Sequence, residues 1–250
     1  MNRQKILSSF YENACSTNAW HANRVQYLVF AGLGLGACGF VAVLQLSDSS
    51  LFQRFLGRIN PLIAFLCAIA VGFALLSWSL SQGWFVIYRE GNRQGLLWAS
   101  GLASVLGIIM ILMDTRIVFP ADTNILFPKS LLFYPAIGFF CEILFHVLPV
   151  VALLVVLSSI FKSARFEALV WVVVLIISAV EPVYHMMDMV SSNRFPSWAV
   201  VYVGFHVFLF NLIQLRIFKR YDFVSMYVFR LVYYLFWHIG WGYVRLRVLF

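Results

Sequence analysis

Charged residues are scarce in this sequence. Asp, Glu, Lys and Arg make up 11% of its 250 residues, whereas 62% are hydrophobic. A soluble domain usually carries about 25% charged residues and about 45–50% apolar ones. A chain of this composition could not cover itself with a surface that water solvates, so an ordinary soluble globular protein is excluded.

Cysteine pairs are also lacking. The four cysteines form no CxxC pair, and three of them lie in apolar segments: Cys38, Cys67 and Cys141. Buried thiols at such positions usually pack as small hydrophobic side chains. We therefore expect no disulfide framework.

The N-terminal residues lack the features of a cleavable signal peptide. Arg3 and Lys5 are present, but no apolar core with a small-residue cleavage site follows them. We expect the first membrane span to act as its own insertion signal. Residues 1–24 form a polar segment that could lie as an interfacial helix, with Phe10, Tyr11 and Trp20 at headgroup depth.

The sequence has no linker, low-complexity tract or soluble domain, so residues 25–250 are predicted to form a single transmembrane domain. A helix needs roughly 20 apolar residues to cross the hydrocarbon core. Segments of this kind occupy residues 25–46, 61–80, 95–113, 131–160, 167–190, 198–218 and 223–244. The fourth contains Pro135 and Pro149 and could be one tilted helix or two pieces. We therefore predict an all-α, polytopic helical bundle with seven or eight spans; the continuous apolar runs do not fit a β-barrel.

The net charge of +8 does not indicate nucleic-acid binding. Lys and Arg stand in ones and twos at the ends of the apolar segments, where they flank membrane helices and meet lipid headgroups. With seven spans, ten lie on the N-terminal side and seven on the other. This distribution favours a cytoplasmic N-terminus, and we expect the protein to reside in a bacterial inner membrane.

Ionisable and polar residues return in the second half of the chain, inside or near the apolar segments. An ionisable side chain at bilayer depth costs about 2.5–3.5 kcal/mol, so such residues usually face the protein interior, pair with one another and mark function. The set comprises Glu142, His146, Glu181, His185, Asp188, His206, Asn211, Arg230 and His238.

The spacing of these residues predicts two polar faces. Glu142 and His146 are four residues apart, as are Glu181 and His185, so each pair shares one face of a helix. Two such faces could converge with His238 into a metal site or an acid–base centre. Pro149 and Pro182 each free a helical carbonyl beside these pairs, which favours a polar cavity there.

A structural interpretation stays open beside this one. Glu–His pairs can be interhelical glue worth about 0.6 kcal/mol each. His206 could be a packing residue, Asn211 and Gln214 could bond across helices, and Arg230 and Asp188 could snorkel to an interface.

The order of these motifs resembles the CPBP family of intramembrane proteins, which includes the CAAX prenyl endopeptidases and Abi-type bacterial members. That family carries EExxxR, then FxxxH, then HxxxN or HxxxD on successive helices. Here CEILFH (141–146) and EPVYH (181–185) take the first two places, and the stretch 210–242 resembles the closing helices and makes His238 the third-motif histidine. The resemblance covers about residues 130–250.

The resemblance implies an intramembrane metallopeptidase that acts on a peptide or prenylated substrate. Glu142 would be the base, His185 and His238 would hold the water or a divalent metal such as zinc together with Glu142, and His146 would support them. Glu181 would pair with His185.

The motifs depart from the family pattern at four positions. Cys141 stands in place of the first glutamate, His146 in place of the arginine, Glu181 in place of the phenylalanine, and Gly242 in place of the final Asn or Asp. Since the first glutamate is the family's expected base, these departures predict altered or absent peptidase activity.

Two other classes of function stay open. One is a non-catalytic membrane subunit or assembly factor of a larger membrane complex, for which the aromatic content of 18% suits broad contacts with other helices. The other is an intramembrane metal- or haem-binding protein, although known di-iron bundles use Glu-x-x-His with a spacing of three rather than four. A transporter would call for an inverted repeat, which we do not find.

Overall fold

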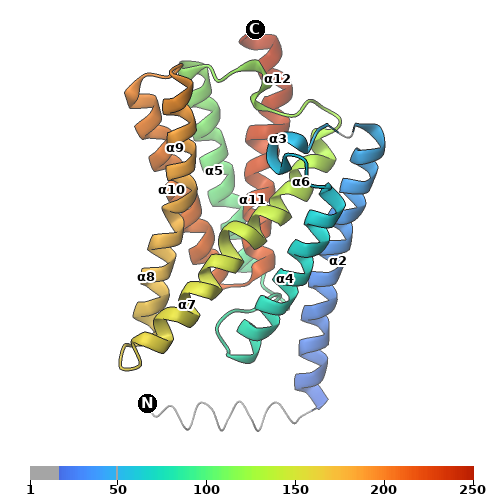
Figure 1. Ribbon diagram of the computed structural model, residues 1–250, viewed down its shortest axis with the longest axis vertical. Helices are drawn as coiled ribbons and strands as arrows, with labels where there is room; N and C mark the ends of the chain where they lie inside the picture. The colour runs from blue at the N-terminus through green and yellow to red at the C-terminus, as the bar shows by residue number, and fades with distance from the viewer. Residues whose placement is uncertain (1–16, 49) are drawn as a thin grey trace.

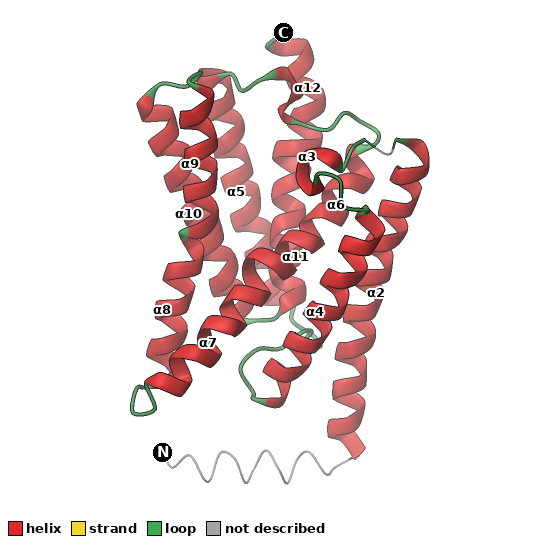
Figure 2. Ribbon diagram, in the orientation of Figure 1, coloured by secondary structure: helices red, strands yellow, loops and turns green. Residues whose placement is uncertain are grey.

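The computed structural model describes residues 17–48 and 50–250, with side chains from residue 23 onward, and this part of the chain is all α-helical (Figure 1, Figure 2). This confirms the predicted fold class. The predicted interfacial placement of Phe10 and Tyr11, and of the Trp20 side chain, lies outside the described residues.

The helices follow one another along the chain with short connections. In order they are α2 (Thr17–Ser47), α3 (Gln53–Leu56), α4 (Pro61–Ser81), α5 (Arg93–Ile117), η1 (Ala121–Thr123), α6 (Ser130–Cys141), η2 (Glu142–Val147), α7 (Leu148–Ile160), α8 (Phe166–Ser178), α9 (Val180–Ser192), α10 (Ser197–Arg220), α11 (Phe223–Tyr234), η3 (Leu235–Trp241) and α12 (Gly242–Val248).

Six helices in the described ranges are long and apolar enough to cross a membrane, fewer than the seven or eight that the sequence predicted. They comprise Asn23–Ser47, Pro61–Ser81, Arg93–Ile117, Ser130–Ile160, Phe166–Ser192 and Ser197–Arg220. The fourth is one continuous rod of α6, η2 and α7 that runs diagonally across the bundle, so it supplies one span and not two (Figure 1).

The predicted seventh span, 223–244, is helical but too polar to be counted among the six. It consists of α11, η3 and α12 and carries Arg230, His238 and several tyrosines. α11 packs against α5, α6 and α10 and buries Arg230, Tyr233 and Tyr234. Because its neighbours are protein, this helix does not need the apolar surface that lipid demands of an outer helix.

Local sequence sets where several helices begin. Asn60 caps α4, its side-chain oxygen accepting from the Leu62 amide at 2.9 Å, and Pro61 occupies the first helical position. Asn92 caps α5 through the Gly95 amide at 2.9 Å, and Asp222 caps α11 through the Ser225 amide at 2.7 Å. These side chains satisfy amide groups that the first turn of a helix leaves free.

Proline explains the irregular places in the fourth and fifth candidate spans. Pro149 cannot donate to the Phe145 carbonyl, and the helix just before it widens into the π-helical turn η2, in which the Leu148 amide bonds to the Ile143 carbonyl five residues back. Pro182 cannot donate to the Ser178 carbonyl, and α8 and α9 are separated there at Ala179. Both breaks lie next to a Glu–His pair.

A buried ion pair joins the ends of α5 and α12. The guanidinium of Arg245 donates from Nε to Asp114 Oδ2 at 2.7 Å and from Nη2 to Asp114 Oδ1 at 3.1 Å, and both residues are fully buried. Trp241 Nε1 donates to the same carboxylate at 2.6 Å, and the Phe119 amide donates to it at 2.8 Å. Arg245 also bonds to the Pro120 carbonyl. Every charged oxygen in this cluster has a partner.

We expect Asp114→Ala to lower the free energy of unfolding by about 3–5 kcal/mol, because it leaves the Arg245 charge buried and unpaired. Thermal unfolding in mild detergent measures this. The exposed Asp122→Ala, on the connection that follows α5, is the control and should change stability by less than about 0.5 kcal/mol. Equal losses for the two variants would contradict the assignment.

Candidate functional site

Two carboxylates share one guanidinium in the middle of the bundle. Arg230 Nε donates to Glu142 Oε1 at 2.5 Å, and Arg230 Nη2 lies 3.7 Å from Glu181 Oε2. The Gln214 amide donates to the same oxygen of Glu142. The side chain of Glu142 has no exposed surface and that of Arg230 is 2% exposed. We call Glu142, His146, Glu181, His185 and Arg230 the charged cluster.

Four helical elements position the charged cluster. η2 supplies Glu142 and His146, α9 supplies Glu181 and His185, α11 supplies Arg230, and α10 supplies the supporting Gln214. Arg230 is fixed further by its own helix, since its Nη1 donates to the hydroxyl of Tyr234 one turn later at 2.9 Å. The alternative that Arg230 snorkels to an interface is therefore wrong: its charge is paired in the interior.

The two histidines extend the charged cluster at both ends. His146 Nδ1 lies 3.2 Å from Glu142 Oε2, and His185 Nε2 lies 3.8 Å from Glu181 Oε1. His146 is buried, whereas 45% of the His185 side chain is exposed. The five side chains thus form a chain of contacts of 4 Å or less, from the edge of the bundle at His185 to its interior at His146. The sequence predicted both Glu–His pairs and their approach to one another, and the structure brings them together through Arg230.

His238 lies apart from these pairs. Its Nδ1 is 2.6 Å from Asn124 Oδ1, and its ring stacks on Tyr134 with 4.5 Å between the ring centroids. Its ring centroid lies 4.9 Å from that of Tyr234, whose hydroxyl accepts from Arg230. Asn124 and Tyr234 were not predicted as site residues. Asn124 belongs to the 118–129 connection, and nothing in its local sequence marks it.

The predicted metal ligands were Glu142, His185 and His238. No group of three or more His, Cys, Asp or Glu side chains among the described residues is arranged to hold a metal ion. In the structure Glu142 binds Arg230, and His238 binds Asn124. Both contacts would have to break for a zinc ion to bind Glu142, His185 and His238 together, and zinc binding stays a prediction.

The charged cluster is not fully hydrogen-bonded, unlike the two buried aspartates at the bundle ends. Within the described part of the chain, Glu142 Oε2, His146 Nδ1 and Glu181 Oε2 have no hydrogen-bond partner, although each has an ionisable neighbour within 4 Å. His146 Nδ1 lies 3.2 Å from Glu142 Oε2 without forming a hydrogen bond. Both side-chain atoms of Asn211 are likewise unpartnered.

The satisfied sites show the contrast. Asp222 accepts from the Ser225 amide, from the Arg89 amide at 3.0 Å and from the Asn92 side chain at 2.8 Å. Asp114 is saturated in the same way by Arg245, Trp241 and the Phe119 amide. Of these three buried carboxylate sites, only the charged cluster has carboxylate oxygens without a hydrogen-bond partner. Two carboxylates face one guanidinium there, and with neutral histidines one further proton would make the net charge of the cluster zero.

The other predicted polar residues are placed separately. His206 is buried and its Nε2 lies 3.2 Å from the Tyr233 hydroxyl, which agrees with a packing role. Asp188 is exposed on α9.

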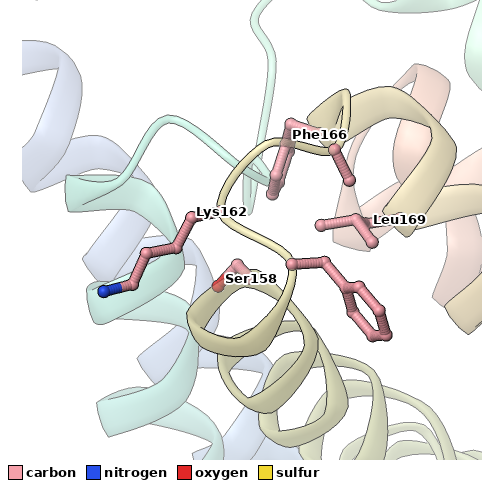
Figure 3. A pocket seen from close by; sticks show the side chains of 6 residues that line it. Ser158, Lys162, Phe166 and Leu169 are labelled. Carbon is pink, nitrogen blue, oxygen red and sulfur yellow. The ribbon is translucent and has the colours of Figure 1, made fainter.

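Two pockets open at the end of the bundle opposite the C-terminus. One, of about 200 Å³, lies between the end of α7 and the start of α8 beside Ser158, Lys162, Phe166 and Leu169 (Figure 3). The second, of about 180 Å³, lies at the start of α5 beside Arg89, Asn92 and Asp222. Neither is lined by a residue of the charged cluster, so neither gives a substrate access to it.

We expect Arg230→Leu to lower the free energy of unfolding by about 3–5 kcal/mol, because two carboxylates would then lie buried without a counter-charge. Adding Glu142→Gln should recover part of that loss, and a double-mutant cycle in mild detergent measures the coupling. The exposed Arg116→Leu is the control, with a change below about 0.5 kcal/mol. Additive effects of the two substitutions would show that Glu142 and Arg230 do not interact.

Comparison with models of protein families, with curated protein sequences and with solved structures finds no match for this chain. The resemblance to the CPBP family therefore rests on the motif order alone. Composition and structure together establish an all-α, multi-pass helical membrane protein.

Proposed function

We propose that this membrane protein is a non-catalytic subunit or assembly factor of a larger membrane complex, built on a CPBP-like arrangement of helices in a bacterial inner membrane. The observation that carries this proposal is the state of Glu142. Its Oε1 is bound by the Arg230 guanidinium and the Gln214 amide, and its Oε2 faces His146.

A general base needs a carboxylate oxygen within hydrogen-bond reach of the water that it activates. Oε1 of Glu142 is bound by two donors. Oε2 accepts no hydrogen bond, but it is buried beside His146 in a side chain with no exposed surface. The position of the family's first glutamate is occupied by Cys141, which offers no carboxylate in compensation. Metal or haem binding has less support still, because the candidate donors are held by separate partners.

An intramembrane peptidase is the second candidate, and one observation favours it. Both Glu–His pairs reach the same arginine, and His185 at the edge of the bundle is half exposed. A prenylated peptide that enters sideways from the lipid could meet the charged cluster there. In that case a movement of Arg230 would have to free Glu142.

Gentle purification from native membranes separates the two candidates. For the non-catalytic subunit we expect a stable assembly larger than the single chain. The assembly and its cellular function should survive Glu142→Gln combined with His185→Ala, because neither residue performs chemistry. The measurements are native mass determination and complementation of a deletion strain.

A peptidase assay gives the result that would contradict the non-catalytic subunit. Cleavage of a prenylated peptide by the purified protein, abolished by Glu142→Gln but unaffected by His206→Ala, would establish the peptidase. His206 is the matched control because it is a buried histidine outside the charged cluster.

A further inference from the structure

The outward face of α9 differs from the outward faces of α2 and α5. Tyr184 is 71% exposed, the His185 side chain is 45% exposed, and Asp188 is exposed on the same helix. On α9 these polar side chains stand beside exposed apolar ones, which are Val180, Val183, Met187 and Val190. Away from their helix ends, α2 and α5 expose large apolar side chains. They include Leu28 and Leu35 on α2, and Leu97, Val105 and Leu112 on α5.

This polar face lies within a candidate membrane span. α9 is the second half of the span Phe166–Ser192, and His185 precedes the end of that helix at Ser192 by two helical turns, about 10 Å at 1.5 Å per residue. The hydrocarbon core is about 30 Å thick, so Tyr184 and His185 are at hydrocarbon depth and Asp188 is near its edge. Polar side chains at this depth are stable when another protein group or water meets them rather than lipid tails.

The face also carries uncompensated negative charge. Asp188 forms no ion pair with any residue that the structure describes. Glu181 lies one helical turn before His185 and two turns before Asp188. It shares Arg230 with Glu142, and the guanidinium is 2.5 Å from Glu142 but 3.7 Å from Glu181. Glu181 also has His185 Nε2 at 3.8 Å and its Oε2 is buried, so Asp188 is the carboxylate of α9 that is open to a partner.

We propose that the outward face of α9, formed by Tyr184, His185 and Asp188, docks a transmembrane helix of another membrane protein that carries an arginine or lysine. A cation on that helix is complementary to the exposed carboxylate of Asp188. The exposed ring of Tyr184 lies one helical turn before Asp188 and can bind the same cation. The proposal rests on the proposed function, since it assigns to one helix the contact that a membrane subunit must make.

Photo-cross-linking in native membranes tests which face meets the partner. A photo-reactive phenylalanine analogue replaces Tyr184 in the full chain. Control chains carry it at Leu112 of α5 or Leu35 of α2, which are 61% and 69% exposed on apolar faces. We expect a cross-linked membrane protein from position 184 and none from the controls.

Charge reversal tests the chemistry of the contact. Asp188→Lys should lower the recovery of that protein at least about tenfold, the effect of losing a charge pair at an interface. Exchanging the basic residue of its helix for aspartate should restore recovery. Asp122→Lys is the matched control because it makes the same change in charge at an exposed site on the same end of the bundle, and it should leave recovery unchanged.

The outcomes separate this inference from the proposed function. A stable assembly that cross-links through position 35 or 112 overturns the role of α9 and leaves the proposed function standing. Cross-linking from 184 to a second copy of this chain, or to lipid alone, overturns the foreign helix. The absence of any assembly removes both. If position 184 cross-links but Asp188→Lys does not lower recovery, or the exchange in the partner helix does not restore it, the inference that the partner carries a cation is wrong.

Discussion

The rest of the structure depends on the pairing of the Arg230 guanidinium with the carboxylates of Glu142 and Glu181 in the interior of the bundle. It connects η2, α9 and α11, and Gln214 adds α10. Water cannot screen these charges, so removing one of them leaves the others uncompensated. The helices that contribute to the charged cluster must therefore keep their relative depth and rotation, and the helices around them pack on that arrangement.

Irregular helix geometry gives the charged cluster its shape. The π-helical turn η2 and the break at Ala179 lie where Pro149 and Pro182 withhold amide donors, and each stands beside a carboxylate that faces Arg230. Asp114 and Asp222, which connect helix ends at the two ends of the bundle, are fully hydrogen-bonded. The charged cluster combines disturbed backbone with unsatisfied side-chain atoms, because two carboxylates share one guanidinium beside helical turns that lack regular hydrogen bonds.

Sequence reasoning reached the fold class and the boundaries of the apolar helices, because a bilayer imposes length and apolarity on every span. It also reached both Glu–His pairs, since a spacing of four residues fixes a helix face. It could not pair Arg230 with Glu142, 88 residues away, or His238 with Asn124, because a helix face does not say which neighbour it meets. The candidate spans number six among the described residues, slightly below the predicted seven or eight, because the closing helix is central in the bundle, where a more polar sequence is acceptable.

That closing helix has a consequence for how the protein is made. α11 carries a charge that lipid would not accept alone, and it follows in the chain every helix that it packs against. When it leaves the ribosome, the carboxylates of Glu142 and Glu181 are already in the membrane. Its insertion is therefore tied to recognition by an assembled bundle rather than to its own partitioning, and the final step of biogenesis selects for bundles whose earlier helices have found their places.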